Sequence, residues 1–172
     1  RTRQQQRDLA ARREALYREG EGLNSQARPA EAAAVWRRAA RLGGRFRHVR
    51  EGARVDEDDR RTRWSSWLWA GMALGSRSRH REAAGSFLRA IFVDPRLADA
   101  HTNRGVALDN LGRLNEALGA HGRALALDAG HVNAHSNQGA VLSQLGRLDE
   151  ASGCFLRNAL VPLGRQGEAA LA

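Results

Sequence analysis

The chain has 172 residues, enough for one domain or for a short array of repeats that share a core. Alanine, leucine and arginine dominate, aromatic residues make up 5% and proline occurs three times, so the composition favours an all-α protein. The single cysteine excludes an internal disulfide bond, no stretch is long and apolar enough for a membrane span, and no secretory leader is visible in the sequence. These features are those expected of an intracellular protein, in the cytoplasm or in an organelle interior.

Charge is distributed unevenly along the chain. The formal net charge is +9, and all 28 basic residues are arginine. Residues 1–97 hold 22 arginines against 12 acids, whereas residues 98–172 hold 6 against 7. Because arginine binds phosphate and carboxylate groups well, the N-terminal half predicts a basic surface for RNA or an acidic partner. Its candidate residues are Arg45, Arg47, Arg50, Arg60, Arg61 and Arg63.

The first predicted segment, residues 1–46, combines an N-terminal helix with a degenerate repeat unit at 13–46. This unit carries Gly20, Leu23, Ala32, Trp36 and Ala39, a spacing that recurs with more regularity after residue 63. The next unit follows at a distance of 51 residues, although the later units are 34 apart. About 17 residues are therefore inserted between the first unit and the second.

Residues 47–63 form the predicted charged linker. The stretch "RFRHVREGARVDEDDRRTR" from residue 45 onward has few apolar residues, which favours a solvated segment over a packed one. A docking arm for RNA or an acidic partner is the alternative. The acidic run at 56–59 has the oxygen ligands for a divalent cation, but it more simply favours the start of the next helix by meeting its positive dipole end.

Residues 64–165 contain three units with a period of 34. Six columns match in register, and they are Gly71, Gly105 and Gly139; Leu74, Leu108 and Leu142; Arg79, Arg113 and Arg147; Glu82, Glu116 and Glu150; Ala83, Ala117 and Ala151; Arg89, Arg123 and Arg157. Such periodicity is typical of repeat architectures in which each unit buries its apolar face against its neighbours. The unit boundaries are 64–97, 98–131 and 132–165.

The residue types in these units resemble the tetratricopeptide repeat (TPR) family. The first of the three units fits best, with Trp67, Gly71, Leu74, Ala83, Phe87, Ala90 and Pro95 in the family's positions. The resemblance implies a right-handed α-solenoid of antiparallel helix pairs. Its glycines would lie where the two helices of a pair touch, the leucines with Phe87 and Phe155 would fill the core, and Pro95 would end a helix. Pro162 and Gly164 would end the last one, and residues 166–172 would begin a capping helix.

The resemblance also implies a binding groove lined by the first helix of each pair. The matching positions are Ser65, Leu68, Trp69, Met72 and Ser76; Asp99, Thr102, Asn103, Val106 and Asn110; Asn133, Ser136, Asn137, Ala140 and Gln144. We single out Leu68, Trp69, Met72, Asn103, Val106, Asn110, Asn137 and Gln144 as the candidate partner-binding residues. Trp67 occupies the family's buried tryptophan position, whereas Trp69 lies on another face of the same helix.

The groove residues can be compared with two modes of peptide binding known in the family. Asn103 and Asn137, in "AHTNRG" and "AHSNQG", are similar to the asparagine ladder in the repeat region of O-linked N-acetylglucosamine transferases, where amides bind a peptide backbone. Trp69 and Arg18 interrupt this column in the earlier units. The clamp that binds the carboxylates of chaperone tails has its matching positions at Tyr17, Glu21, Asn103, Asn133 and Asn137, and only Asn103 fits. We therefore expect no chaperone-tail binding of that kind.

The sequence holds no catalytic motif, so we expect neither an enzyme nor a bound cofactor. His131 and His135 have a spacing that suits a metal, but no third ligand is evident and a structural role is favoured, so no metal site is predicted. Cys154 is expected to be a small buried residue.

The predicted function is that of a non-catalytic scaffold, a subunit of a larger complex that binds proteins or peptides in the groove. Two alternatives stay open. One is the substrate-presenting repeat region of a glycosyltransferase. The other is a ribonucleoprotein component that holds RNA through its basic half.

Overall fold

The computed structural model describes residues 3–42 and 57–169. Within these ranges all regular structure is α-helical. The helices are α1 (Arg3–Ser25), α2 (Pro29–Arg41), α3 (Glu57–Gly75), α4 (His80–Val93), α5 (Ala98–Asp109), α6 (Leu114–Leu127), α7 (Val132–Gln144) and α8 (Leu148–Ala169). The chain divides into an N-terminal unit, Arg1–Pro95, and a C-terminal unit, Arg96–Ala172.

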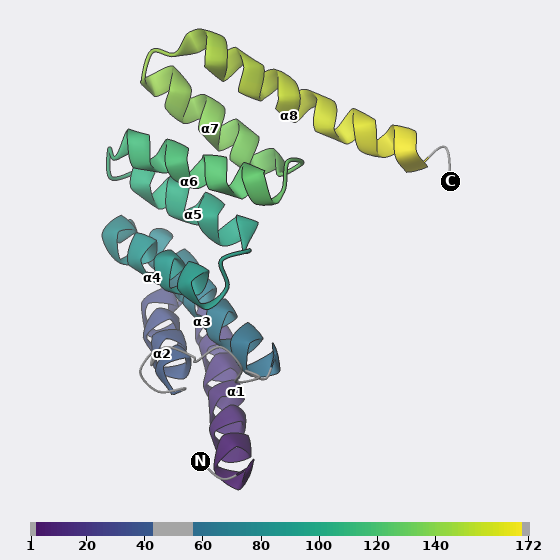
Figure 1. Ribbon diagram of the computed structural model, residues 1–172. Coiled ribbons are helices and arrows are strands. Elements are labelled where there is room, and N and C mark those ends of the chain that lie inside the picture. Colours follow the sequence, from purple (N-terminus) through teal and green to yellow (C-terminus); the bar gives the residue numbers. More distant parts are fainter. Residues whose placement is uncertain (1–2, 43–56, 170–172) are drawn as a thin grey trace. The chain divides into compact units, whose positions relative to one another are not determined.

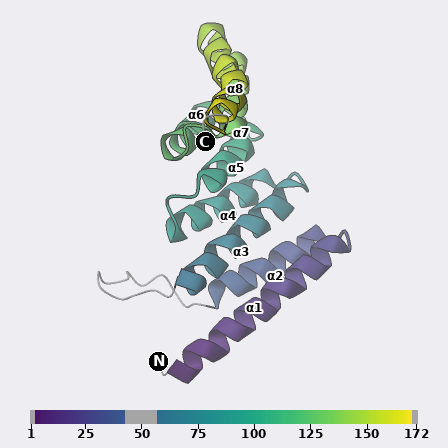
Figure 2. The same cartoon turned by 90° about the vertical axis from the view of Figure 1, so that its right-hand side faces the viewer.

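Each unit contains two helix pairs, and the helices of a pair run antiparallel (Figure 1). In the N-terminal unit α1 packs on α2, α2 on α3, and α3 on α4 (Figure 2). In the C-terminal unit α5 packs on α6, α6 on α7, and α7 on α8 (Figure 1). We call the first helix of each pair the A helix (α1, α3, α5, α7) and the second the B helix (α2, α4, α6, α8).

A ring on the B helix packs against a glycine on the A helix in every pair. The four contacts are Gly20 with Trp36, Gly71 with Phe87, Gly105 with His121, and Gly139 with Phe155. A methyl group placed on Gly71 would lie 2.5 Å from the Phe87 ring, and one on Gly139 would lie 2.8 Å from the Phe155 ring. Any side chain at these glycines would therefore have to displace the ring or the helix that carries it. This contact, the ring socket, explains the predicted glycine column.

The turn between the helices of each pair is also repeated. One residue has a positive φ in each turn: Ala27 (57°), Ser78 (58°), Gly112 (72°) and Gly146 (74°). The next residue, an arginine in all four pairs, donates its backbone N–H to the leucine carbonyl five residues earlier, as from Arg113 to Leu108 at 2.9 Å. These are Schellman-type helix ends, which favour glycine at the left-handed position.

The same arginine then begins the B helix. It forms an ion pair with the glutamate three residues later, and the four pairs are Arg28–Glu31, Arg79–Glu82, Arg113–Glu116 and Arg147–Glu150, at 2.6–2.7 Å. All are solvent-exposed, so solvent and salt screen them and each contributes little to stability. They place negative charge in the first turn of each B helix, where the helix dipole favours it. The arginine and glutamate columns are thus local helix-start features.

The structure differs from the sequence prediction at three places. Helix α3 begins at Glu57, so residues 57–63 of the predicted linker 47–63 are helical, while residues 43–56 lie outside the described residues. Helix α8 continues to Ala169 with no break at Pro162 or Gly164, so residues 166–169 extend α8 and do not begin a capping helix. Phe155, predicted to fill the core, fits against Gly139 but is 45% exposed, because no further helix covers α8 among the described residues.

Candidate functional site

In the N-terminal unit, helices α1, α2 and α3 bring three aromatic residues together. Trp69 of α3 lies with its ring centroid 6.1 Å from that of Trp36 of α2, at an interplanar angle of 40°. Trp36 is buried and donates its indole N–H to the carbonyl oxygen of Tyr17 at 3.1 Å. Tyr17 of α1 in turn interacts with Trp69. Trp69 is therefore held on two sides, yet 38% of it remains exposed.

The surroundings of Trp69 are part apolar and part acidic. Met72, one turn along α3, is 43% exposed, and Leu68 is half-buried. Burial raises the pKa of the Tyr17 hydroxyl, and the Glu21 carboxylate raises it further, while Trp69 acts in the opposite direction. Glu21 is exposed and lies one turn from Tyr17 on α1. We call Tyr17, Glu21, Leu68, Trp69 and Met72 the tryptophan patch.

The other two tryptophans of α3 have different positions. Trp67 is 3% exposed, which confirms its predicted place in the core, and the Arg89 guanidinium lies 4.9 Å from its ring centroid. Trp64 is half-buried. Of the three, Trp69 alone combines a fixed ring with substantial exposure.

In the C-terminal unit, Asn103 of α5 and Asn137 of α7 occupy the column that Trp69 holds in α3, each 34 residues from the last. Both are half-buried. Within the described part of the chain, neither side-chain amide has a hydrogen-bond partner. Val106, one turn beyond Asn103, is 38% exposed. An amide that is partly buried and unpaired can bind a peptide group, because it offers both a donor and an acceptor.

The other two amides among the candidate partner-binding residues, Asn110 and Gln144, already have partners. Asn110 donates its Nδ2 to the Val106 carbonyl at 2.9 Å, and Gln144 donates its Nε2 to Asp109 Oδ1 at 3.1 Å. The second bond links α7 to α5. Asn110 and Gln144 thus support the A helices, and a ligand would have to displace these bonds to use their amides.

The paired histidines have structural partners. His131 caps α7 by accepting the Ala134 backbone N–H, and its Nε2 lies 3.0 Å from Asp99 Oδ1. His135 Nε2 lies 2.9 Å from the Ala129 carbonyl oxygen. Within the described ranges, no three histidine, cysteine, aspartate or glutamate side chains group as metal ligands would.

His121 is a residue that the sequence prediction missed. It occupies the column of Phe87 and Phe155, is fully buried, and has no hydrogen-bond partner for either ring nitrogen among the described residues. Burial lowers its pKa to about 4; Asp109 opposes this shift and His131 adds to it. The 34-residue period could have revealed it as a histidine in an aromatic column.

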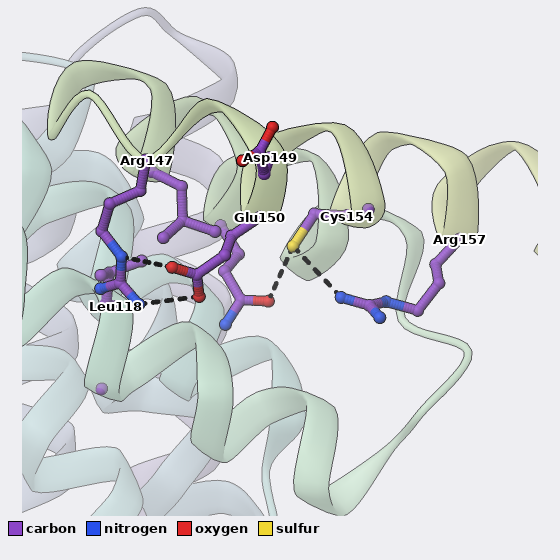
Figure 3. Close-up of a pocket in the computed structure, with 10 residues that line it drawn as sticks. Leu118, Arg147, Asp149, Glu150, Cys154 and Arg157 are labelled. Carbon is purple, nitrogen blue, oxygen red and sulfur yellow. Dashed lines mark hydrogen bonds and ion pairs between the residues drawn. The ribbon is translucent and has the colours of Figure 1, made fainter.

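A pocket of about 600 Å³ lies between α6, α7 and α8 (Figure 3). None of its lining residues is a predicted groove position. Cys154 is buried there, as predicted, and donates its thiol to Gln138 Oε1 at 3.3 Å. Arg157 Nη2 lies 3.6 Å from the Cys154 sulfur, and Arg147 pairs with Glu150. The polar groups of this pocket largely satisfy one another.

The predicted basic surface is not assembled by the described residues. Arg45, Arg47 and Arg50 lie outside them, as does the side chain of Arg60. Arg61 is exposed, but Arg63 is half-buried, and burial lowers the pKa of its guanidinium. Arg63 also lowers the pKa of the buried Arg13, an effect second to that of burial. Among the described residues no helix has the length and apolar character needed to cross a membrane.

Solved structures define the class of fold. The structure of MamA matches with a TM-score of 0.74 and 19% identity over 90% of this chain and 81% of MamA. YrrB, described as a TPR protein with an unusual peptide-binding site, matches at 0.68 and 20% over 86% and 67%. The second TPR of Spaghetti (RPAP3), bound to the HSP90 peptide SRMEEVD, matches at 0.56 and 24% over 57% and 91%.

The chain therefore has the fold of the tetratricopeptide repeat proteins, as its repeat pattern predicted. No protein-family model and no curated protein sequence matches it. The similarity is thus one of structure at low sequence identity.

Proposed function

We propose that this protein is a non-catalytic scaffold that binds peptide segments of other proteins on its A helices, as a subunit of a larger complex. The observation that carries the proposal is one column of residues, Trp69, Asn103 and Asn137, which share a position in successive A helices. Each side chain is partly exposed: Trp69 offers ring surface, and the amides of Asn103 and Asn137 have no hydrogen-bond partner among the described residues. The structural neighbours include one TPR bound to a peptide and one with a peptide-binding site, which supports the same function.

The two amides favour a particular mode of binding. Asn103 and Asn137 would hydrogen-bond to the backbone of an extended peptide, as the similarity to glycosyltransferase repeat regions implies. Backbone recognition of this kind reads little sequence. Side-chain selectivity would then come from positions such as Val106 and from the tryptophan patch.

The proposal is tested by capture of partners from the source cells, with quantitative mass spectrometry. The wild-type chain is compared with Trp69→Ala and with the double variant Asn103→Ala, Asn137→Ala. Matched controls are Leu88→Ala and Asn115→Ala, which remove exposed side chains from B helices. We expect both A-helix variants to lose a fixed set of proteins that both controls retain.

Nuclease treatment separates the ribonucleoprotein alternative. A set of partners that survives nuclease and depends on the A-helix residues supports the scaffold function. A set that disappears with nuclease and ignores the A-helix variants would contradict it and would favour RNA binding by the arginines. Retention of all partners by all variants would also contradict it.

A further inference from the structure

The tryptophan patch has a chemical bias that a general peptide-binding face does not require. Trp36 packs against the Trp69 ring and Tyr17 interacts with it. What remains of Trp69 for a partner is the open 38%, bordered by the exposed thioether of Met72. A fixed aromatic surface of this kind attracts cations as well as apolar groups, because the ring faces carry partial negative charge.

The carboxylates near the tryptophan patch favour a cation over an apolar group. Glu14 and Glu21 lie one turn before and one turn after Tyr17 on α1, so both carboxylates are close to the aromatic cluster. Besides burial, both also raise the pKa of Tyr17, and Glu21 does so in part by hydrogen bonding to its side chain. Glu14 is paired with Arg18 at 3.3 Å. Glu21 has no basic partner among the described residues, although the chain carries 28 arginines.

Other glutamates of the described helices show what Glu21 lacks. Glu31, Glu82, Glu116 and Glu150 each have an arginine within 2.7 Å. An exposed carboxylate beside an open indole ring supplies the two components of a cation site, because one attracts the charge and the other packs against the carbon atoms that carry it.

We propose that the tryptophan patch binds an arginine side chain of a partner peptide, with its guanidinium between Glu21 and Trp69 and its methylene groups against Met72. This inference rests on the proposed function and names the kind of side chain that the N-terminal unit selects. Arginine fits better than lysine, since its planar guanidinium both stacks on an indole ring and pairs with a carboxylate. An acidic peptide would meet Glu21 with like charge and is disfavoured.

The test uses the indole N–H signals of the four tryptophans in a two-dimensional ¹H–¹⁵N NMR spectrum of the full chain. The probes are N-acetyl-arginine amide, its neutral isostere N-acetyl-citrulline amide, and N-acetyl-leucine amide. We expect the arginine probe to shift the Trp69 signal in a saturable way, with at least about five-fold weaker binding of the citrulline probe. Added salt should weaken the arginine response.

Two variants locate the charge. Glu21→Gln should weaken the arginine probe about two- to five-fold. Glu19→Gln, which removes another exposed carboxylate of α1 and gives the same net charge, should leave the affinity unchanged. Equal effects of the two variants, equal binding of arginine and citrulline probes, or no response of Trp69 to the arginine probe would each overturn the cation site.

The leucine probe keeps this outcome separate from the proposed function. If leucine shifts Trp69 and arginine does not, the cation site is wrong while peptide binding on the A helices still stands. Failure of the proposed function itself would appear in the capture experiment, where the A-helix variants would lose no partner.

Discussion

His121 lies with its ring against Gly105, in the place where Phe87 meets Gly71 and Phe155 meets Gly139. The ring fits the socket in shape, but its two nitrogens are buried without hydrogen-bond partners among the described residues. The socket therefore contains a polar group where the other pairs have an apolar one, and burial of that group costs stability.

The first prediction concerns this polar group. His121→Phe should stabilise the protein by about 1–2 kcal/mol at pH 7.5, because it removes two unsatisfied buried nitrogen atoms from a socket that accepts phenylalanine elsewhere. Urea unfolding followed by circular dichroism measures the change. A loss of stability would show that the α5–α6 socket is too small for the larger ring.

The second prediction is a pH dependence. The pKa of His121 is lowered from 6.5 to about 4 in the folded protein, so below pH 6.5 the unfolded chain gains a proton that the folded chain does not. The free energy of unfolding is therefore highest above pH 6.5. It falls progressively between pH 6.5 and pH 4, by about 3 kcal/mol in total. Urea unfolding between pH 7.5 and pH 4.5 should show this loss in the wild type and a smaller one in His121→Phe. Equal slopes would contradict the assignment to His121.

The third prediction concerns the socket glycines. Gly105→Ala should destabilise the protein by about 3 kcal/mol or more, because its methyl group would overlap the His121 ring. Gly119→Ala is the matched control, since nothing lies within 4 Å of the added methyl group and alanine is the better helix former. We expect it to stabilise by up to about 1 kcal/mol. Thermal unfolding of the two variants should therefore shift in opposite directions.

The fourth prediction concerns the left-handed turn positions. Gly112→Ala should cost about 1 kcal/mol from backbone strain alone, since no atom lies within 4 Å of the new side chain. Ser78→Gly, at the equivalent position with φ of 58°, should change stability in the favourable direction by up to about 1 kcal/mol. Chemical unfolding measures both, and destabilisation by Ser78→Gly would contradict a strained turn.

The fifth prediction separates Trp69 from Trp67. Trp67→Ala should destabilise by about 3–5 kcal/mol, because Trp67 is 3% exposed. Trp69→Ala should cost about 1–2 kcal/mol, since it loses the ring contact with Trp36 and part of its buried apolar area but leaves no closed cavity. Urea unfolding measures both. An equal cost for the two variants would place Trp69 in the core and remove it from the binding surface.

Much of the fold could be predicted because each 34-residue unit makes the same contacts between its two helices. The period of 34 aligned Gly71, Gly105 and Gly139, and the TPR resemblance correctly indicated helix pairs in close contact at these positions. The column of Trp69, Asn103 and Asn137 followed from the same resemblance, and its role in binding stays a prediction. The spacing of residues within a helix pair determines which residues face each other, so contacts inside a pair can be predicted from sequence.

Other features depend on contacts that spacing does not reveal. The contact between Trp69 and Trp36 joins residues from different helix pairs across the inserted segment. That Glu21 has no basic partner among the described residues depends on where the arginine side chains lie. The continuation of α8 through Pro162 ran against local propensity. His121 was not predicted to be buried, because the other residues in its column, Phe87 and Phe155, are more hydrophobic.

Each ring socket joins two residues that are sixteen positions apart in the chain, from Gly20 and Trp36 to Gly139 and Phe155. Contacts of such short sequence separation cost little chain entropy to form, and proteins rich in them fold quickly. Each hairpin of helices can thus close before its neighbours are complete, as when the chain leaves the ribosome. Gain or loss of a whole 34-residue module during evolution would likewise leave every remaining socket intact.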